Sequence, residues 1–252
     1  MQIKSIYIYP IKSLPGISLN ESIIEPKGLQ WDRNYVLIDQ SGAFMSQRFH
    51  DMMHAFDLRL DQDKLLIYSQ ILNSSITLYL RADDSDTPTS ISIWNQPRKS
   101  FKLAFRDVNE FFKDHFKLNV SVFRTDRNNR STIHYHDSKP ILIVNQASIE
   151  YLEQALNYQI SPLRFRPNVI LNGSEAWNEL KWKDLYLQNT TWVFNKKCSR
   201  CIMINRDPQN GSKIINILND IKPWTKSHFK IKFGVYYSPT SPGIVRIGDE
   251  IG

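Results

Sequence analysis

The feature that most constrains the fold of this chain is a succession of short strand-like runs separated by turn signals. The first run, 3–9, is rich in Ile and Tyr and ends at Pro10, a residue that cannot donate a hydrogen bond to a strand ladder. Further runs follow, with turn signals such as Pro26-Lys27-Gly28 and Gln40-Ser41-Gly42 between them. Many short strands with frequent turns are typical of a β-barrel or a β-sandwich.

Strand-like runs extend along most of the chain, and three stretches have helical character instead. Strands are expected at residues 3–9, 17–24, 35–39, 44–47, 56–61, 65–68, 76–80, 91–94, 120–123, 141–144, 169–171, 185–187, 191–194, 229–237 and 244–247. Helices are expected at 108–116 with Asp107 as N-cap, from Asn145 to Ser148 onward, and at 214–221. The expected fold class is mainly β with a few helices (α+β).

Composition limits the class of protein. The 252 residues are 41% hydrophobic and 23% charged, which is ordinary for a globular protein. Lys and Arg outnumber Asp and Glu, 32 to 25, so the protein should favour anionic partners, although such an excess also serves solubility. We find no secretion signal and no membrane-spanning run, and the two cysteines fit a reducing compartment, so a cytoplasmic location is expected.

Both cysteines lie in one stretch, Lys196 to Gly211. Positive charge beside Cys198 and Cys201 favours the thiolate, the form that attacks and binds metals. The turn signal Asp207-Pro208-Gln209-Asn210-Gly211 places the thiols on a loop that leaves a strand. The pair could be a redox disulfide, a nucleophile, a metal ligand or an inert structural pair, and the spacing alone does not choose between nucleophile and ligand. A redox pair usually belongs to a thioredoxin-like alternation of strands and helices, which this chain lacks.

Other chemistry-bearing residues are dispersed. His134 and His136 alternate, but two histidines without a further placed ligand are more often surface residues. Basic residues from Arg124 to Arg130 could form an anion or partner surface, or a solvated loop. The residues Arg164-Phe165-Arg166 before Pro167 are expected to display their guanidinium groups from an extended segment. Without a P-loop or a Gly-x-Gly-x-x-Gly motif, an anionic cofactor would be held by dispersed Arg, Lys and backbone groups, with the helix start at Asn145 as a further anion seat.

These pieces together resemble the MOSC family, named for the molybdenum cofactor sulfurase C-terminus. The motifs similar to its N-terminal β-barrel domain are Tyr9-Pro10-Ile11-Lys12-Ser13, Gly28-Leu29-Gln30-Trp31-Asp32-Arg33 and Ser46-Gln47-Arg48. The motifs similar to the MOSC domain are Arg164 to Asn168, Cys198-Ser199-Arg200-Cys201 with Asp207-Pro208 and Gly211, Phe233-Gly234-Val235-Tyr236, and Gly248-Asp249. The resemblance implies an N-terminal β-barrel domain at 1–105, packed on a MOSC β-barrel domain at 106–252.

Within that family the chain resembles most the mitochondrial amidoxime-reducing component and its bacterial relatives. The resemblance implies a molybdenum cofactor (molybdopterin with Mo), with Cys201 as metal ligand and catalytic residue. The residues that it implies for cofactor binding are Lys12, Ser13, Arg33, Arg166, Asn168, Ser199, Arg200 and Tyr236. The implied activity is reduction of N-hydroxylated or N-oxygenated compounds. The resemblance is also compatible with a description as a pyridoxal-phosphate-binding protein.

Electrons would come from a separate protein, ferredoxin-like or cytochrome-type with a reductase, because two cysteines cannot hold a four-cysteine iron–sulfur cluster. No membrane or nucleic-acid partner is expected. The residues Ile204-Asn205-Arg206 stand where the family typically has a Thr-Thr-Val run, a difference that would alter the polarity of the substrate pocket. Two alternatives stay open: a sulfur carrier with a persulfide on Cys201, and a non-catalytic protein that binds anions or nucleic acid.

Overall fold

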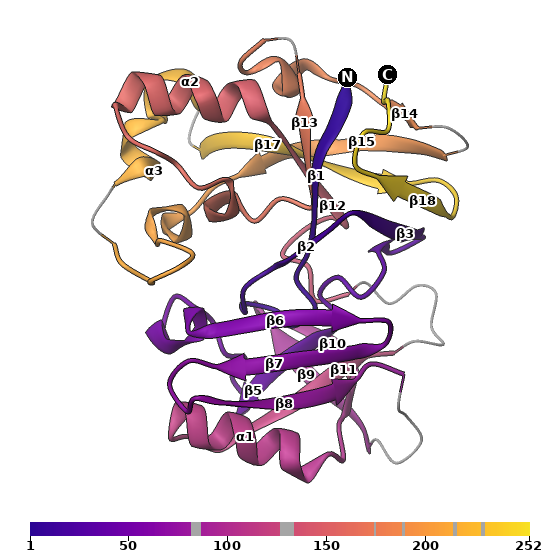
Figure 1. Cartoon of the computed structure of the whole chain (residues 1–252), viewed down its shortest axis with the longest axis vertical. Coiled ribbons are helices and arrows are strands. Elements are labelled where there is room, and N and C mark those ends of the chain that lie inside the picture. Colours follow the sequence, from indigo (N-terminus) through magenta and orange to yellow (C-terminus); the bar gives the residue numbers. More distant parts are fainter. Residues whose placement is uncertain (82–86, 127–133, 174, 188–189, 214–215, 228–229) are drawn as a thin grey trace. The chain divides into compact units, whose positions relative to one another are not determined.

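A computed structural model describes residues 1–81, 87–126, 134–173, 175–187, 190–213, 216–227 and 230–252 (Figure 1). These residues form two compact units, each built from separate segments of the chain. The first unit contains 1–8, 18–30 and 137–252, and the second contains 9–17 and 31–136. The division of the sequence between residues 105 and 106 stays a prediction.

The first unit is organised around one mixed sheet with the order β14-β15-β17-β12-β13-β1-β2 (Figure 1). The strands are β1 (Gln2–Ile8), β2 (Ile17–Leu19), β12 (Ile141–Asn145), β13 (Val169–Asn172), β14 (Leu185–Leu187), β15 (Thr190–Ser199) and β17 (Lys230–Pro239), with β16 (Lys226–Ser227) paired to β17. Strands β12 and β13 run parallel, and the crossover between them contains helix α2 (Gln146–Leu156). Every residue of β12 is buried, as the continuous apolar run Ile141 to Val144 predicts.

Smaller elements complete this unit. A second sheet has the order β18-β3-β4, from β3 (Glu21–Glu25), β4 (Gly28–Leu29) and β18 (Gly243–Arg246). The short helices are η2 (Pro162–Phe165), η3 (Asn178–Lys181), η4 (Ile202–Asn205), α3 (Ile217–Asp220) and α4 (Lys222–Thr225). Helix α2 begins as expected, because the Asn145 side chain accepts a hydrogen bond from the Ala147 N–H at 3.2 Å.

The second unit contains two antiparallel sheets and one long helix. One sheet has the order β5-β11-β10-β9, from β5 (Tyr35–Asp39), β9 (Thr87–Ile93), β10 (Gln96–Lys102) and β11 (Val120–Thr125). The other is β6-β7-β8, from β6 (Phe56–Asp61), β7 (Lys64–Ser69) and β8 (Ser74–Tyr79). Helix α1 (Arg106–Phe116) packs against β8 and β11, and η1 (Asp51–His54) precedes β6.

The fold class is confirmed: the chain is mainly β with a few helices. Three local predictions are wrong. Residues 44–47 form no strand, and only a single bridge joins Ile38 to Phe44. Helix α1 starts at Arg106, so Asp107 lies in its first turn and is not the N-cap. Strand β10 was not expected. The helix expected at 214–221 is found as Ile217–Asp220, and residues 214 and 215 lie outside the described part.

Each unit has an apolar core of its own. In the first unit, buried side chains of β12, α2, η4 and β17 pack together, among them Val144, Leu152, Ile204 and Phe233. In the second, Val36, Phe123 and Tyr135 belong to a buried cluster within the β5-β11-β10-β9 layer. No helix among the described residues is long and apolar enough to cross a membrane.

Gly234 in β17 is required by close backbone packing. Its φ is +74°, and a Cβ placed there would lie 2.7 Å from the Ile143 carbonyl oxygen of the neighbouring strand. We expect Gly234→Ala to lower the free energy of unfolding by about 2 kcal/mol or more, because it combines backbone strain with a backbone clash. Chemical denaturation measures this loss.

Gly248→Ala is the matched control in the same unit. Gly248 also has positive φ, +91°, but no atom lies within 4 Å of its added Cβ. This variant should lose only the strain cost of about 1 kcal/mol. Equal losses in the two variants would contradict the role given to the Ile143 contact.

Candidate functional site

The two cysteines lie at the end of β15 and at the start of η4. Strand β15 pairs with β17, and the register shifts between the pairs Lys197–Val235 and Ser199–Lys232, so that Gly234 lies in the irregular stretch opposite Cys198. Neither cysteine is in a disulfide. The Cys198 side chain is buried, with 1% exposure, whereas Cys201 is half-buried at the residue before η4. Of the two thiols, Cys201 is therefore the one that a ligand can reach.

Arg200, between the cysteines, is fixed by four contacts within the first unit. Its backbone N–H donates to the Ile231 carbonyl at 2.9 Å. Its guanidinium donates to Cys198 Sγ at 2.8 Å and to the Phe165 carbonyl at 2.5 Å. The same group lies 5.4 Å from the centroid of the Phe165 ring. The Nε atom is buried and has no hydrogen-bond partner among the described residues.

The surroundings of Arg200 favour the protonated form of its guanidinium. Burial opposes that charge, but Cys198, Tyr236 and Cys201 more than offset the effect, so the pKa of the guanidinium is raised. Burial, followed by the electrostatic effect of Cys198, raises the pKa of the Tyr236 hydroxyl. Cys198, Arg200 and Tyr236 thus form one linked group beside Cys201.

Arg164 holds the loop that follows Cys201. Its guanidinium donates to the carbonyl of Asn205 at 3.1 Å and to the Asp207 carboxylate at 2.6 Å. The same carboxylate accepts from the backbone N–H groups of Gln209 and Asn210, at 2.9 and 3.3 Å. Asp207 is thus the centre of the turn, as the sequence predicts.

The expectation that both arginines of Arg164-Phe165-Arg166 are displayed from an extended segment is wrong. Arg164 lies on the short helix η2 and is only 5% exposed, because its charge is compensated by Asp207 inside the unit. Arg166 adopts a left-handed conformation, φ +52°, rather than an extended one. The residue before a proline avoids the right-handed helical region. Arg166 satisfies this restriction with a left-handed conformation instead of the extended one that was expected.

The unusual stretch Ile204-Asn205-Arg206 is packed inside the first unit. Ile204 belongs to the apolar core. The Asn205 amide donates to the Asn216 side chain at 2.9 Å and accepts from the Leu218 N–H at 2.8 Å. Arg206, 5% exposed, donates to the Gly211 carbonyl at 3.2 Å. These side chains stabilise the loop after Cys201, and their effect on a substrate pocket stays a prediction.

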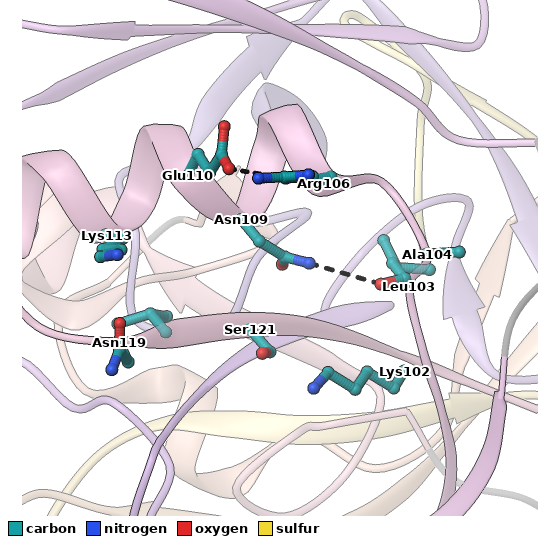
Figure 2. A pocket seen from close by; sticks show the side chains of 10 residues that line it. Lys102, Leu103, Ala104, Arg106, Asn109, Glu110, Lys113, Asn119 and Ser121 are labelled. Carbon is teal, nitrogen blue, oxygen red and sulfur yellow. Dashed lines mark hydrogen bonds and ion pairs between the residues drawn. The ribbon is translucent and has the colours of Figure 1, made fainter.

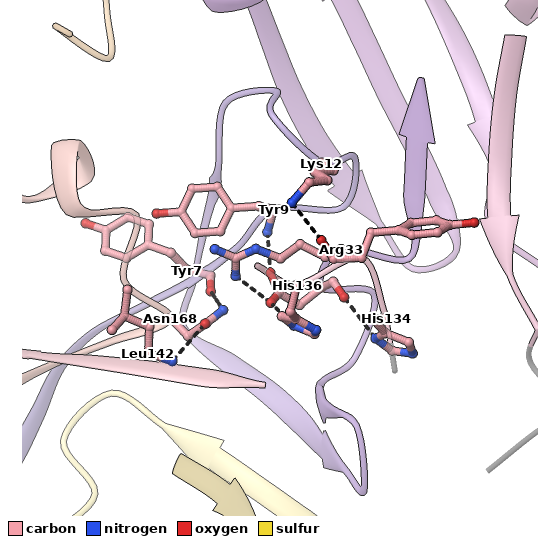
Figure 3. A network of polar contacts seen from close by, with 10 residues as sticks. Tyr7, Tyr9, Lys12, Arg33, His134, His136, Leu142 and Asn168 are labelled. Carbon is pink, nitrogen blue, oxygen red and sulfur yellow. Dashed lines mark hydrogen bonds and ion pairs between the residues drawn. The ribbon is translucent and has the colours of Figure 1, made fainter. Parts of the chain in front are cut away.

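Two more residues proposed for the cofactor lie in this unit. Asn168 is 1% exposed, and its amide accepts from the Leu142 N–H at 3.1 Å and donates to the Tyr7 carbonyl at 3.1 Å (Figure 3). It therefore links β12 to β1, which is a structural task. Ser199 is exposed, and its hydroxyl accepts from Lys232 Nζ at 2.7 Å.

The second unit contains Lys12, Ser13 and Arg33. Lys12 is 5% exposed, and its ammonium donates to the Tyr135 carbonyl at 3.0 Å. Ser13 is half-buried with φ +71°. The Arg33 guanidinium lies 4.3 Å from the Tyr9 ring centroid and donates to the Asp32 carboxylate at 2.5 Å (Figure 3). The second unit thus fixes two cationic side chains, Lys12 and Arg33, through contacts with its own residues.

Asp32 and the two histidines form a buried network that the sequence did not reveal. Asp32 is fully buried and accepts from His136 Nε2 at 2.9 Å, while His134 Nδ1 lies 3.0 Å from the Asp32 carbonyl oxygen. The expectation that these histidines are surface residues is wrong, since they are 4% and 5% exposed. The clue available in the sequence is the alternation of His134 and His136, which places both rings on one side, stacked 5.7 Å apart.

The basic stretch expected from Arg124 to Arg130 begins inside β11. Arg124 is 9% exposed, and its guanidinium lies 4.5 Å from the Phe101 ring centroid. Arg124 therefore does not belong to a solvated surface. Arg127 and Arg130 lie outside the described residues.

Two open pockets in the second unit do not include the predicted site residues. One, of about 490 Å³, lies beside α1 and is lined by Lys102, Arg106, Asn109, Glu110, Lys113 and Asn119 among others (Figure 2). Arg106 donates to Glu110 at 2.8 Å there. The other, of about 560 Å³, is lined mainly by β6 and β7 and contains Phe56, Leu58 and Tyr68. Neither pocket contains a cysteine or a histidine.

No group of three or more His, Cys, Asp or Glu that could hold a metal ion occurs among the described residues. A metal at Cys201 would therefore have to bring most of its ligands with it. Chemically, the site offers one reachable thiol, the half-buried Arg200 guanidinium beside it, and a loop that is fixed by Arg164.

The difference in burial between the thiols predicts different reactivity. We expect an aromatic disulfide reagent to modify Cys201 in the folded protein about tenfold or more faster than Cys198, because only Cys201 is reachable. The single variants Cys198→Ser and Cys201→Ser assign the two rates, and unfolded protein gives the control in which both react alike. Faster modification of Cys198 would contradict the burial described above.

Asp32 should make stability depend on pH in acid. Burial alone would raise its pKa, but Arg33 and His136 outweigh burial and lower the pKa from 3.8 to about 2. A carboxyl with a lower pKa in the folded state stabilises that state above its unfolded pKa, and the stabilisation is lost as the pH falls from about 4 towards 2. The difference in unfolding free energy between wild type and Asp32→Asn should shrink by about 2 kcal/mol over this range. Denaturation curves at each pH measure it, and a constant difference would refute the prediction.

Known families and proteins match this chain over nearly all its length. The profile of the MOSC N-terminal beta barrel domain matches residues 1–119, and that of the MOSC domain matches residues 130–252. Mitochondrial amidoxime-reducing component 1 of Homo sapiens is 24% identical over 281 residues, which cover 99% of this chain and 82% of that protein. Molybdenum cofactor sulfurase of Oryza sativa subsp. japonica is 24% identical over 265 residues, covering 93% of this chain and 32% of that protein.

Among solved structures, the crystal structure of the YUAD protein from Bacillus subtilis matches with a TM-score of 0.44 and 12% identity, covering 99% of this chain and 93% of that one. The two domain profiles follow one another in the order of the motifs found in the sequence. The chain belongs to the MOSC family.

Proposed function

We propose that this protein is a molybdenum-cofactor oxidoreductase that reduces N-hydroxylated or other N-oxygenated compounds. The observation that supports it most directly is the placement of Cys201, which is reachable and adjoins a fixed guanidinium, while Cys198 is buried. Relatives named amidoxime-reducing components, which match 99% of the chain, support the choice of substrate class.

The residues present are compatible with a pterin-bound molybdenum. A single reachable thiol, with no group of three metal-binding residues among the described ones, suits a metal whose other ligands belong to the cofactor. The buried Arg200 Nε, which lacks a hydrogen-bond partner among the described residues, offers a donor for an acceptor on a bound ligand. When bound, this cofactor supplies two-electron chemistry that removes oxygen from the substrate as water.

The chain's own residues would hold and orient that cofactor. We propose Cys201 as the thiolate ligand, with Arg200, Tyr236, Ser199, Arg166 and Asn168 as the cofactor-binding residues of the first unit and Lys12, Ser13 and Arg33 as those of the second. Arg200 stabilises negative charge near Cys201, because its guanidinium is fixed and stays protonated. Asn168 contributes by fixing β12 against β1, since its amide already bonds to both strands.

The electron donor would be a separate protein, ferredoxin-like or cytochrome-type with a reductase. The two cysteines of the chain cannot build a four-cysteine cluster. A cytoplasmic location is part of the same proposal.

Replacement of the proposed ligand tests the function. In a host that makes the cofactor, wild-type protein should carry molybdenum and pterin after purification. Cys201→Ser should lose at least about nine-tenths of the molybdenum, because a hydroxyl is a poor substitute for a soft thiolate. The measurement is metal analysis by mass spectrometry with pterin fluorescence on the same sample.

The control for this test is Cys198→Ser, a buried thiol that is not the proposed ligand. It should retain more molybdenum than Cys201→Ser. Wild-type protein without molybdenum and pterin would refute the proposed function. Loss in Cys198→Ser alone would move the ligand role to the other thiol.

A second candidate function is sulfur transfer through a persulfide on Cys201. This candidate is supported by the similarity to a protein named molybdenum cofactor sulfurase, which extends over 93% of this chain. Labile sulfide released by a reductant from wild type but not from Cys201→Ser, in protein free of molybdenum, would select this function over the first.

A further inference from the structure

Arg33 is held by contacts of both its backbone and its side chain. Its backbone is in the left-handed region, φ +51°, which arginine rarely adopts. Its N–H donates to the Tyr9 carbonyl at 2.9 Å, and its own carbonyl accepts from the Tyr135 N–H at 2.9 Å. The guanidinium stacks on Tyr9 and bonds to Asp32, and the side chain is only 13% exposed. An exposed arginine for solubility needs none of this.

Asp32 is placed to direct that guanidinium. One carboxylate oxygen accepts from the Tyr9 N–H at 2.7 Å and so fixes the plane of the carboxylate. The other oxygen accepts from both Arg33 and His136. A fully buried carboxylate is costly unless all its partners are present, so its position and that of Arg33 are determined together.

His136 completes the arrangement as a neutral donor. Burial lowers its pKa, and Arg33 and Lys12 lower it further, against the opposing effect of Asp32. The neutral ring that donates from Nε2 leaves Nδ1 as a bare acceptor, and this atom is buried without a hydrogen-bond partner among the described residues. The positive charges of Arg33 and Lys12 both act on His136, so two cations lie near this buried ring.

We propose that Asp32 and His136 are positioning residues that orient the Arg33 guanidinium to receive a phosphate group. Under the proposed function, on which this inference rests, that phosphate belongs to the pterin cofactor. Arginine recognises phosphate through a planar, directional fork of N–H donors, so a guanidinium of fixed orientation binds it more tightly than a mobile one. Asp32 and His136 act through Arg33.

The test compares four variants in the full-length protein. Asp32→Asn replaces an acceptor of Arg33 and His136 by an amide, and His136→Phe keeps the ring but removes its donor. His136→Gln can supply an N–H donor again. Ser69→Ala is the matched control, because Ser69 forms another buried pair in the same unit, with its hydroxyl 2.7 Å from His115 Nδ1.

Two readouts separate positioning from folding. The first is molybdenum and pterin retained per protein after gel filtration, compared with the melting temperature of the cofactor-free protein. The second is the apparent affinity of cofactor-free protein for pyrophosphate, measured from the thermal shift. We expect Asp32→Asn and His136→Phe to weaken pyrophosphate binding by about tenfold and to lose cofactor, while His136→Gln recovers most of both. Ser69→Ala should lower the melting temperature without either loss.

The outcomes distinguish this inference from the proposed function. If wild type carries the cofactor and binds pyrophosphate, but Asp32→Asn and His136→Phe do so equally well, the positioning role is overturned and the proposed function stands. The positioning role is also overturned if Ser69→Ala, at a similar melting temperature, loses as much binding as they do. If wild type lacks molybdenum, the proposed function fails, and the pyrophosphate affinities alone decide the role of Asp32 and His136.

Discussion

The pairing of β15 with β17 is the constraint on which the cysteine site depends. The register shift opposite Cys198 requires a residue with positive φ and no side chain on β17, and Gly234 meets both demands. This irregular pairing buries one thiol and lets the chain turn into η4 at Cys201. The backbone bond from Arg200 to Ile231 continues the same contact between the two segments. Backbone geometry therefore separates the two cysteines before any side-chain chemistry does.

Buried charges fix the loops in both units, and each is compensated locally. In the first unit the Arg164 guanidinium neutralises Asp207 and satisfies a carbonyl of the loop after Cys201. In the second, the charge of Asp32 is compensated by Arg33, and the same carboxylate accepts a hydrogen bond from His136. Such pairs add little net stability relative to apolar packing, but removal of one member leaves a charge buried without its partner. Their effect is to make one loop conformation much more favourable than its alternatives.

Local sequence patterns predicted most strands and the position of the cysteine turn, but not the contacts made by distant residues. Strand β10 was not predicted. It contains Pro97, which the structure tolerates because pairing with β11 begins only at Ser100. The buried state of His136 could not be predicted, since its partner Asp32 is 104 residues away. Family motifs supplied the candidate residues. Which of them have structural tasks, as Asn168 does, follows only from the three-dimensional contacts.

The hydrogen bond from Arg200 to the Phe165 carbonyl connects the cysteine site to aromatic side chains of the core. Phe165 stacks on Phe233, with ring centroids 4.0 Å apart, and Phe233 contacts Trp177 in turn. The cation beside the thiols is thereby tied to an aromatic column in the interior. A change of ring size in that column would move the guanidinium relative to Cys201. Sequence variants at these apolar positions should therefore be examined as candidates for altered chemistry as well as for altered folding.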